Sequence, residues 1–366
     1  MISDVGGVNL TAAPLPVRRP TMLDHPRTPA RAAAAPDQPA PGKSRRRWTR
    51  RLRITGIVAL SALGLALAST TVNLTLESAE RASIAPYGER VKVSGGSLNV
   101  YQTGTVGPPI VLLSGLGTAA PALDFAPLIR ALGDRKTIVV EGFGYGYSDM
   151  TAPARTVENI TAEIHEALAR IGVAEPYVLA GHSISGFYTL YYANAYPEEV
   201  SAVIGIDPTM PSGKADQRAA GESKGSKGGI PWSRIPSVTG LVRLADSIAP
   251  SLAEPAGDAY TASERERLRL MSSWNFANPA LTDEGLEMGN NAWKLQGLSY
   301  PDGIPVLDFL AQESIDTIPG WVGDHERQLE NVRQHKIVLL KGDHYLHWTQ
   351  SAVMAEEITD FLKATS

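Results

Sequence analysis

The body of the chain alternates short apolar runs with amphipathic stretches, and this alternation limits the possible folds more than any other feature. Runs of mostly aliphatic residues lie at 110–113, 137–140, 177–180, 200–206, 304–310 and 336–340. Such runs are typical of strands covered on both faces. Between them lie helical patterns, such as the stretch with Ile160, Ile164 and Leu168 on one face. The order predicts an α/β fold with a mostly parallel sheet and helices on both faces.

The alternation stops between residues 209 and 302. This segment opens with a loop rich in Gly, Ser and Lys at 212–229 and continues with helical stretches that no strand interrupts. An insertion of helices between two strands predicts a cap, or lid, over the ends of the sheet. We therefore expect the α/β core at 77–208 and 303–366, with the helical cap at 209–302 between its two parts.

An uncharged segment precedes the core. Residues 54–76 are 23 uncharged, mostly aliphatic positions, which is long enough to cross a bilayer as one helix. Residues 1–53 hold 11 of the 34 Lys and Arg residues but only 3 of the 38 acidic ones. Basic flanks stay in the cytoplasm, so we expect a cytoplasmic tail, a single-pass transmembrane helix that acts as a signal anchor, and an extracytoplasmic body. The composition of residues 1–42 further predicts a disordered tail.

A cleaved signal peptide is the alternative interpretation of this segment. Ala66-Leu67-Ala68 fits a small-x-small cleavage site, with the cut after Ala68. The long leader and the uncharged residues beyond Ala68 favour the uncleaved anchor. In either case the body is exported. The body itself has 35 acidic residues against 23 basic ones, which argues against nucleic acid as its partner.

A serine follows the strand predicted at 177–180. That strand leads into Gly181-His182-Ser183-Ile184-Ser185-Gly186, and a helical pattern begins there. A sharp turn from strand to helix can hold a serine hydroxyl at the end of the sheet. We predict that Ser183 is a nucleophile; the alternative is an ordinary buried turn serine.

A serine hydroxyl needs an adjacent base to take its proton. His344 lies in the loop that leaves the last predicted strand, so it can reach the carboxyl edge of the sheet, where open α/β sheets place their sites. His347 is the alternative base if the register differs by one turn. The chain has no cysteine, which excludes a cysteine nucleophile and a thiolate metal site.

The base in turn needs a carboxylate partner. Asp207 ends the strand after the serine helix, and Glu313 ends the strand after the cap, so both are expected at the correct edge. Spacing alone leaves this choice open.

A tetrahedral oxyanion needs backbone N–H donors. The amide of Ile184 follows the serine at a helix N-terminus, and the loop Ser114-Gly115-Leu116-Gly117 can present the amide of Leu116. That loop lacks the ending of a P-loop and the third glycine of a dinucleotide fingerprint. We therefore expect no cofactor and no metal.

Taken together, these segments resemble the capped serine hydrolases of the α/β-hydrolase fold, and the resemblance covers residues 87–364. It is carried by the segments at 114–117, 141–148, 181–186 and 342–347. It implies Ser183 as nucleophile, His344 as base, and Leu116 and Ile184 as oxyanion donors. Members of the fold that act as dehalogenases or epoxide hydrolases use an aspartate nucleophile, which is absent from this turn.

The chain departs from the usual pattern of the family in three places. Ser114 replaces the histidine of a His-Gly pair, Ser185 replaces the second glycine of the serine turn, and Ser314 stands where the commonest pattern has its aspartate. Some members with a similar C-terminal Gly-x-His-Tyr draw the acid from the earlier strand. The resemblance therefore favours Asp207 over Glu313.

The expected function is a serine esterase that cleaves carboxylic esters through an acyl-enzyme. Three tryptophans in the cap, Trp232, Trp274 and Trp293, suggest a small-molecule substrate with an apolar group. The alternatives are a peptidase, amidase or acyltransferase of the same fold, and a catalytically silent domain that binds a ligand.

Overall fold

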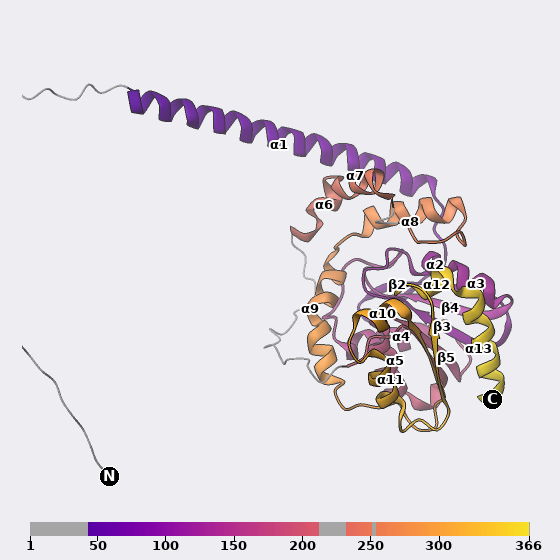
Figure 1. The fold of residues 1–366 in the computed structure, drawn as a ribbon. Coiled ribbons are helices and arrows are strands. Elements are labelled where there is room, and N and C mark those ends of the chain that lie inside the picture. The colour runs from indigo at the N-terminus through magenta and orange to yellow at the C-terminus, as the bar shows by residue number, and fades with distance from the viewer. Residues whose placement is uncertain (1–42, 212–231, 251–253, 366) are drawn as a thin grey trace, which may run out of the picture. The chain divides into compact units, whose positions relative to one another are not determined.

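The computed structural model describes residues 43–211, 232–250 and 254–365 of the chain (Figure 1). The expected disordered tail at 1–42 and the loop at 212–229 lie outside the described residues. The chain divides into two units after Val58, and the longer unit, Ala59–Ser366, holds the sheet and the cap.

Eight strands form one sheet in the order β1-β2-β4-β3-β5-β6-β7-β8. The strands are β1 (Glu89–Val93), β2 (Gly96–Thr103), β3 (Val106–Leu113), β4 (Arg135–Glu141), β5 (Tyr177–His182), β6 (Val200–Ile206), β7 (Val306–Ala311) and β8 (His335–Leu340). The pairs β1/β2 and β2/β4 are antiparallel and all others are parallel. The predicted α/β fold with a mostly parallel sheet is confirmed.

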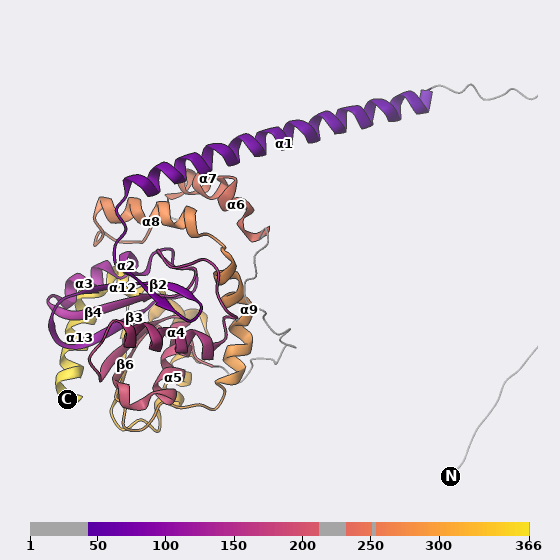
Figure 2. The same ribbon diagram turned by 180° about the vertical axis from the view of Figure 1, so that it is seen from behind.

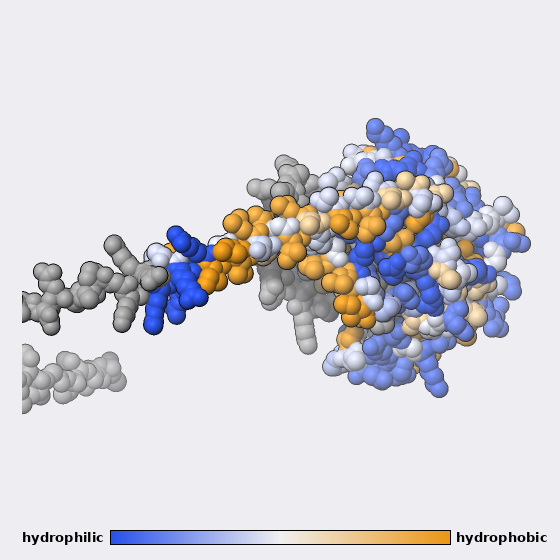
Figure 3. Space-filling view, turned by 90° about the horizontal axis from the view of Figure 1, so that it is seen from above, coloured by the Kyte–Doolittle hydropathy of each residue, from blue (hydrophilic) through white to orange (hydrophobic). Residues whose placement is uncertain are grey.

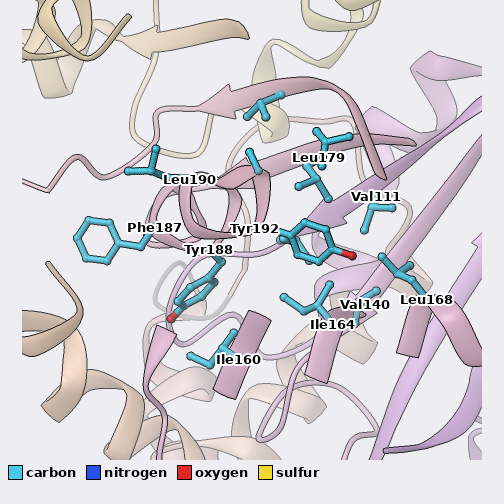
Figure 4. Close-up of a cluster of buried hydrophobic side chains, with 14 of the residues drawn as sticks. Val111, Val140, Ile160, Ile164, Leu168, Leu179, Phe187, Tyr188, Leu190 and Tyr192 are labelled. Carbon is cyan, nitrogen blue, oxygen red and sulfur yellow. The ribbon is translucent and has the colours of Figure 1, made fainter. Parts of the chain in front are cut away.

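Both faces of the central strands are buried because consecutive residues enter different cores. In β3, Val111 belongs to one apolar cluster while Ile110 and Leu112 belong to the other. Helices α4 (Val157–Arg170) and α5 (Ser185–Ala195) cover the first face, and α3 (Ala126–Leu132) and α13 (Ser351–Thr365) cover the second (Figures 1 and 2). Figure 4 shows Ile164 and Leu168 of α4 next to Val140 of the sheet.

The remaining helices of the core are short. They are α2 (Pro121–Asp124), η1 (Pro197–Glu199), α10 (Gln312–Thr317), α11 (Trp321–Leu329) and α12 (Leu346–Thr349).

The described part of the cap is helical, as the sequence predicts. Its elements are η2 (Trp232–Arg234), α6 (Ile235–Val238), α7 (Leu241–Ile248), α8 (Ala262–Asn275) and α9 (Pro279–Lys294). The last two begin at side-chain caps: Thr261 and Glu264 form a reciprocal capping box on α8, and Asn278 accepts hydrogen bonds from the first amides of α9. These caps fix where each helix starts above the sheet.

The N-terminal apolar segment forms a helix that is longer than expected. Helix α1 covers Lys43–Ser83, whereas the uncharged segment covers only 54–76. Within it, Arg47–Ser83 is long and apolar enough to cross a membrane. Its large apolar side chains are exposed, and Figure 3 shows a hydrophilic group before them at the start of the helix.

Candidate active site

Ser183 occupies a strained turn between β5 and α5. Its φ angle is 54°, in the left-handed region that residues with a side chain rarely adopt. Two backbone hydrogen bonds hold it there: the amide of Ser183 donates to the carbonyl of Ile206 (3.1 Å), and the amide of Thr209 donates to the carbonyl of Ser183 (2.8 Å). The neighbouring strand β6 therefore fixes the position of the serine.

The turn needs its first glycine for steric reasons. A Cβ at Gly181 would lie 2.8 Å from the carbonyl oxygen of Ser185 and 2.9 Å from Cγ2 of Thr189. Ser185, which replaces the usual second glycine, is buried, and its hydroxyl donates to the carbonyl of Ser114 at 2.6 Å. This departure from the family pattern thus ties the turn to the 114–117 loop.

The imidazole of His344 lies between Ser183 and Asp207. Its Nε2 is 2.8 Å from Oγ of Ser183, and its Nδ1 is 2.6 Å from Oδ2 of Asp207. His344 stands in the loop after β8, and its side chain is 34% exposed, so the site is accessible from solvent. Three residues that the sequence singles out are therefore in direct contact.

Asp207 is fully buried beyond the end of β6. Besides His344, its carboxylate accepts hydrogen bonds from the Ala311 amide (3.0 Å), the Ser314 hydroxyl (2.5 Å) and Nε1 of Trp321 (3.0 Å). Burial alone would raise the pKa of Asp207, but the bonds from His344, Ser314 and Ala311 outweigh it and hold the pKa below its ordinary value. The carboxylate is thus ionised and fixed next to the imidazole.

Glu313 does not contact the imidazole. Strand β7 ends at Ala311, so Glu313 lies in the first turn of α10 rather than at the strand end where it was expected. Its side chain is exposed, and among the residues that the structure describes its carboxylate accepts a hydrogen bond only from the backbone amide of His344, at 3.3 Å. The residue one position further, Ser314, supports Asp207 instead.

The amides of Leu116 and Ile184 lie on two backbone segments that touch at the serine. A Cβ at Gly115 would be 2.8 Å from Nδ1 of His182 and 3.1 Å from Cβ of Ser183. Ile184 is the N-cap of α5, where the helix dipole is positive. Neither amide donates a hydrogen bond to another described residue.

A second histidine–carboxylate pair lies near His344 and is buried. His347 is fully buried and pairs with Asp124 (Nε2 to Oδ2, 2.7 Å), so the alternative that it acts as the base next to Ser183 is wrong. His182 lies between the pairs and bonds to the carbonyl of His344 (3.1 Å). Burial, with further contributions from His347 and His344, lowers the pKa of His182 well below its ordinary value. Asp124, in a short helix, carried no sequence signal for this role.

A cavity of about 290 Å³ lies next to Leu116, between the core and the cap. Its lining is mostly apolar and includes Leu116, Phe276, Ala277 and Leu281. None of the three cap tryptophans lines it. Trp274 is buried in the cap, while Trp232 and Trp293 are exposed to solvent.

The cap is fastened to the core by polar side chains. Asn275 donates to the carbonyls of Ala119 and Gly146, and Asn278 donates to the carbonyl of Gly144. Glu284 of α9 is buried and accepts hydrogen bonds from two core tyrosines, Tyr145 (2.9 Å) and Tyr188 (2.6 Å). These bonds hold α8 and α9 against residues 119 and 144–146 of the core and against α5.

Comparison with known proteins shows a matching family and fold. The sequence profile described as "Alpha/beta hydrolase family" matches residues 110–363. The chain is 30% identical over 229 residues to "Uncharacterized protein YbdG" of Bacillus subtilis (strain 168), which covers 62% of this chain and 70% of the relative.

Solved structures share the fold at low sequence identity. An esterase from Thermogutta terrifontis superposes with a TM-score of 0.54 at 20% identity, over 76% of this chain and 99% of that one. Epoxide hydrolase VrEH1 from Vigna radiata gives 0.57 at 16% identity, over 75% and 97%. From the profile match, the relative and the fold together, we conclude that this chain belongs to the alpha/beta hydrolase family.

Proposed function

We propose that this protein is a membrane-anchored serine hydrolase that cleaves carboxylic esters through an acyl-enzyme. The observation that carries the proposal is the continuous contact from Ser183 Oγ through His344 to the Asp207 carboxylate, at 2.8 and 2.6 Å. These are hydrogen-bonding distances for a nucleophile, its base and the group that orients the base.

In this mechanism His344 removes the proton of Ser183 as its oxygen attacks the ester carbonyl. The ionised Asp207 stabilises the resulting imidazolium and keeps Nε2 free to accept the proton. The oxyanion accepts hydrogen bonds from the amides of Leu116 and Ile184. His344 then protonates the leaving alkoxide. A water molecule, activated by the same base, attacks the acyl-enzyme and releases the acid.

The cavity next to Leu116 supports a substrate with an apolar group, since Leu116 is the proposed oxyanion donor and also lines the cavity. Its apolar lining by Phe276 and Leu281 favours an ester with an apolar acyl or alcohol group. Epoxide hydrolases of the fold need an aspartate where this chain has Ser183, so the likeness to VrEH1 supports the fold and not that chemistry.

Helix α1 supports the anchored location. Its apolar stretch is long enough to cross a bilayer, and Arg47, Arg50, Arg51 and Arg53 precede it. With the positive end in the cytoplasm, the hydrolase domain is extracytoplasmic.

Hydrolysis of a panel of substrates by the purified full chain tests this function. p-Nitrophenyl esters of increasing acyl length should be cleaved with a burst of one equivalent of nitrophenol, while aminoacyl anilides should not. Ser183→Ala should abolish the turnover and the burst. Faster cleavage of the anilides than of every ester would instead identify a peptidase, and no turnover of either class would favour a silent binding domain.

A further inference from the structure

The end of α1 is packed onto the cap. Asn73 of α1 is buried and donates to the carbonyls of Ser237 (3.0 Å) and Val238 (3.2 Å) at the end of α6. A Cβ at Gly240 would lie 3.2 Å from Cβ of Asn73, so the two backbones approach closely there.

Two turns further along α1, charged groups continue this contact. Glu80 accepts two hydrogen bonds from Arg243 of α7 (2.7 and 2.9 Å) and one from Nε1 of Trp274 of α8 (3.0 Å). Residues 69–83 of α1, α6, α7 and α8 therefore form one packed assembly.

The length of the proposed transmembrane span determines where this assembly lies relative to the bilayer. A helix needs about 20 residues to cross the hydrocarbon core of a bilayer. Counted from Ile54, the first residue after the arginines, the span ends at Asn73. Because Ser69 and Asn73 both contact the end of α6, the junction of α6 and α7 lies at the level where the helix leaves the hydrocarbon.

The cap exposes apolar side chains at this same junction. In α7, Leu241 and Leu244 are each 54% exposed and Ile248 is 75% exposed, and their spacing places them on one face of the helix. Before α7, Trp232 of η2 and Ile235 of α6 are also exposed, with Trp232 at 81%. Apolar helix faces with a nearby tryptophan are typical of elements that lie in the membrane interface.

We propose that η2, α6 and the apolar face of α7 are immersed in the interfacial layer of the bilayer that α1 crosses. The cap then lies on the membrane surface. The recognition is by apolar burial, because Arg243, the basic residue within α7, is paired with Glu80. This inference rests on the proposed span of α1 and not on the chemistry of Ser183.

Site-specific labelling of the full chain in phosphatidylcholine vesicles tests the immersion. The chain has no cysteine, so Leu244→Cys and, separately, Ile248→Cys each carry a single nitrobenzoxadiazole label. The matched control is Leu339→Cys. Leu339 is also 54% exposed, but it lies on β8 of the α/β domain and not in the cap. The two α7 labels should show blue-shifted emission and should be quenched by nitroxide-bearing lipid, while the control label should do neither.

A fourth label separates failure of this inference from failure of the span. Leu65→Cys lies within the uncharged segment and reports on the span alone. If the label at 65 is quenched while those at 244 and 248 behave like the one at 339, α1 spans the bilayer but the cap is not immersed, and the inference is wrong. If all four labels stay unquenched, the span and the inference both fail. Ester hydrolysis, measured in parallel, is independent of either result.

Discussion

The carboxylate of Asp207 contacts Nδ1 of His344 at 2.6 Å, although the two residues are 137 positions apart in the chain. The contact exists because β6 and β8 end at the same edge of the sheet with only β7 between them. Both residues lie in the loops that leave those ends. The proposed chemistry depends on this relationship, since an imidazole without a fixed carboxylate would not present Nε2 to Ser183.

The choice of carboxylate gives the first prediction. Asp207→Asn should lower kcat by about 10⁴-fold, the loss expected when the imidazole is held in the wrong tautomer. Glu313→Gln should leave kcat within a few-fold of the wild-type value, because the carboxylate of Glu313 bonds to the backbone amide of His344 and not to its imidazole. Steady-state hydrolysis of one p-nitrophenyl ester measures both. A larger loss in the Glu313 variant would show that the resting contact is not the catalytic one.

The close approach at Gly115 gives the second prediction. Gly115→Ala should push the 114–117 loop away, because the new methyl group would meet His182 and Ser183. If that loop supplies an oxyanion donor, kcat of the folded variant should fall on the order of 10². Gly303→Ala, whose methyl group would enter open space, is the control and should leave kcat unchanged. Equal rates in the two variants would exclude the loop from catalysis.

The hydroxyl of Ser185 gives the third prediction. Ser185→Ala removes the hydrogen bond to the carbonyl of Ser114 and should lower the free energy of unfolding by about 1 kcal/mol. It should also lower kcat, because the 114–117 loop loses its tie to the serine turn. Ser247→Ala, at an exposed position in α7, serves as the control for denaturant titrations and should change stability by less than about 0.5 kcal/mol. A stability loss with unchanged kcat would limit Ser185 to a structural role.

The buried imidazole of His182 gives a prediction on pH. Burial, together with His347 and His344, lowers the pKa of His182 in the folded state. In the unfolded chain His182 has its ordinary pKa of about 6.5, so below that pH the unfolded chain binds more protons than the folded one. The contribution of the neutral His182 imidazole to the free energy of unfolding is therefore fully present above about pH 6.5. It decreases as pH falls, by up to about 1.4 kcal/mol per pH unit. The unfolding free energy of the wild type, minus that of His182→Gln, should decrease from pH 7 to pH 5. A difference independent of pH would contradict the buried neutral imidazole.

Much of the fold could be predicted because both faces of the central strands are buried. This makes β3, β5 and β6 nearly continuous apolar runs that the sequence shows directly. Ser183 and His344 could be placed for a related reason: each follows a strand that ends at the same edge. Ser183 could be identified from its sequence motif, and His344 from its position after the last strand.

The partner of His344 could not be chosen from spacing alone. Asp207 and Glu313 both follow strands at the correct edge, and the difference depends on where β7 ends and α10 begins. That boundary turns Ser314 toward Asp207 and leaves Glu313 exposed. Trp321 also contacts Asp207, but its role depends on how α11 packs, which local sequence does not encode. The contact of α1 with the cap could not be predicted either, because it also depends on how distant elements pack.

The most direct test of the central claim is covalent labelling of the folded full chain with a fluorophosphonate, followed by mapping of the adduct by mass spectrometry. The account predicts one adduct, on Ser183, and a labelling rate lower on the order of 10² or more in His344→Ala, which lacks the base. An unlabelled Ser183 in the folded wild type, or equal labelling rates with and without His344, would contradict it.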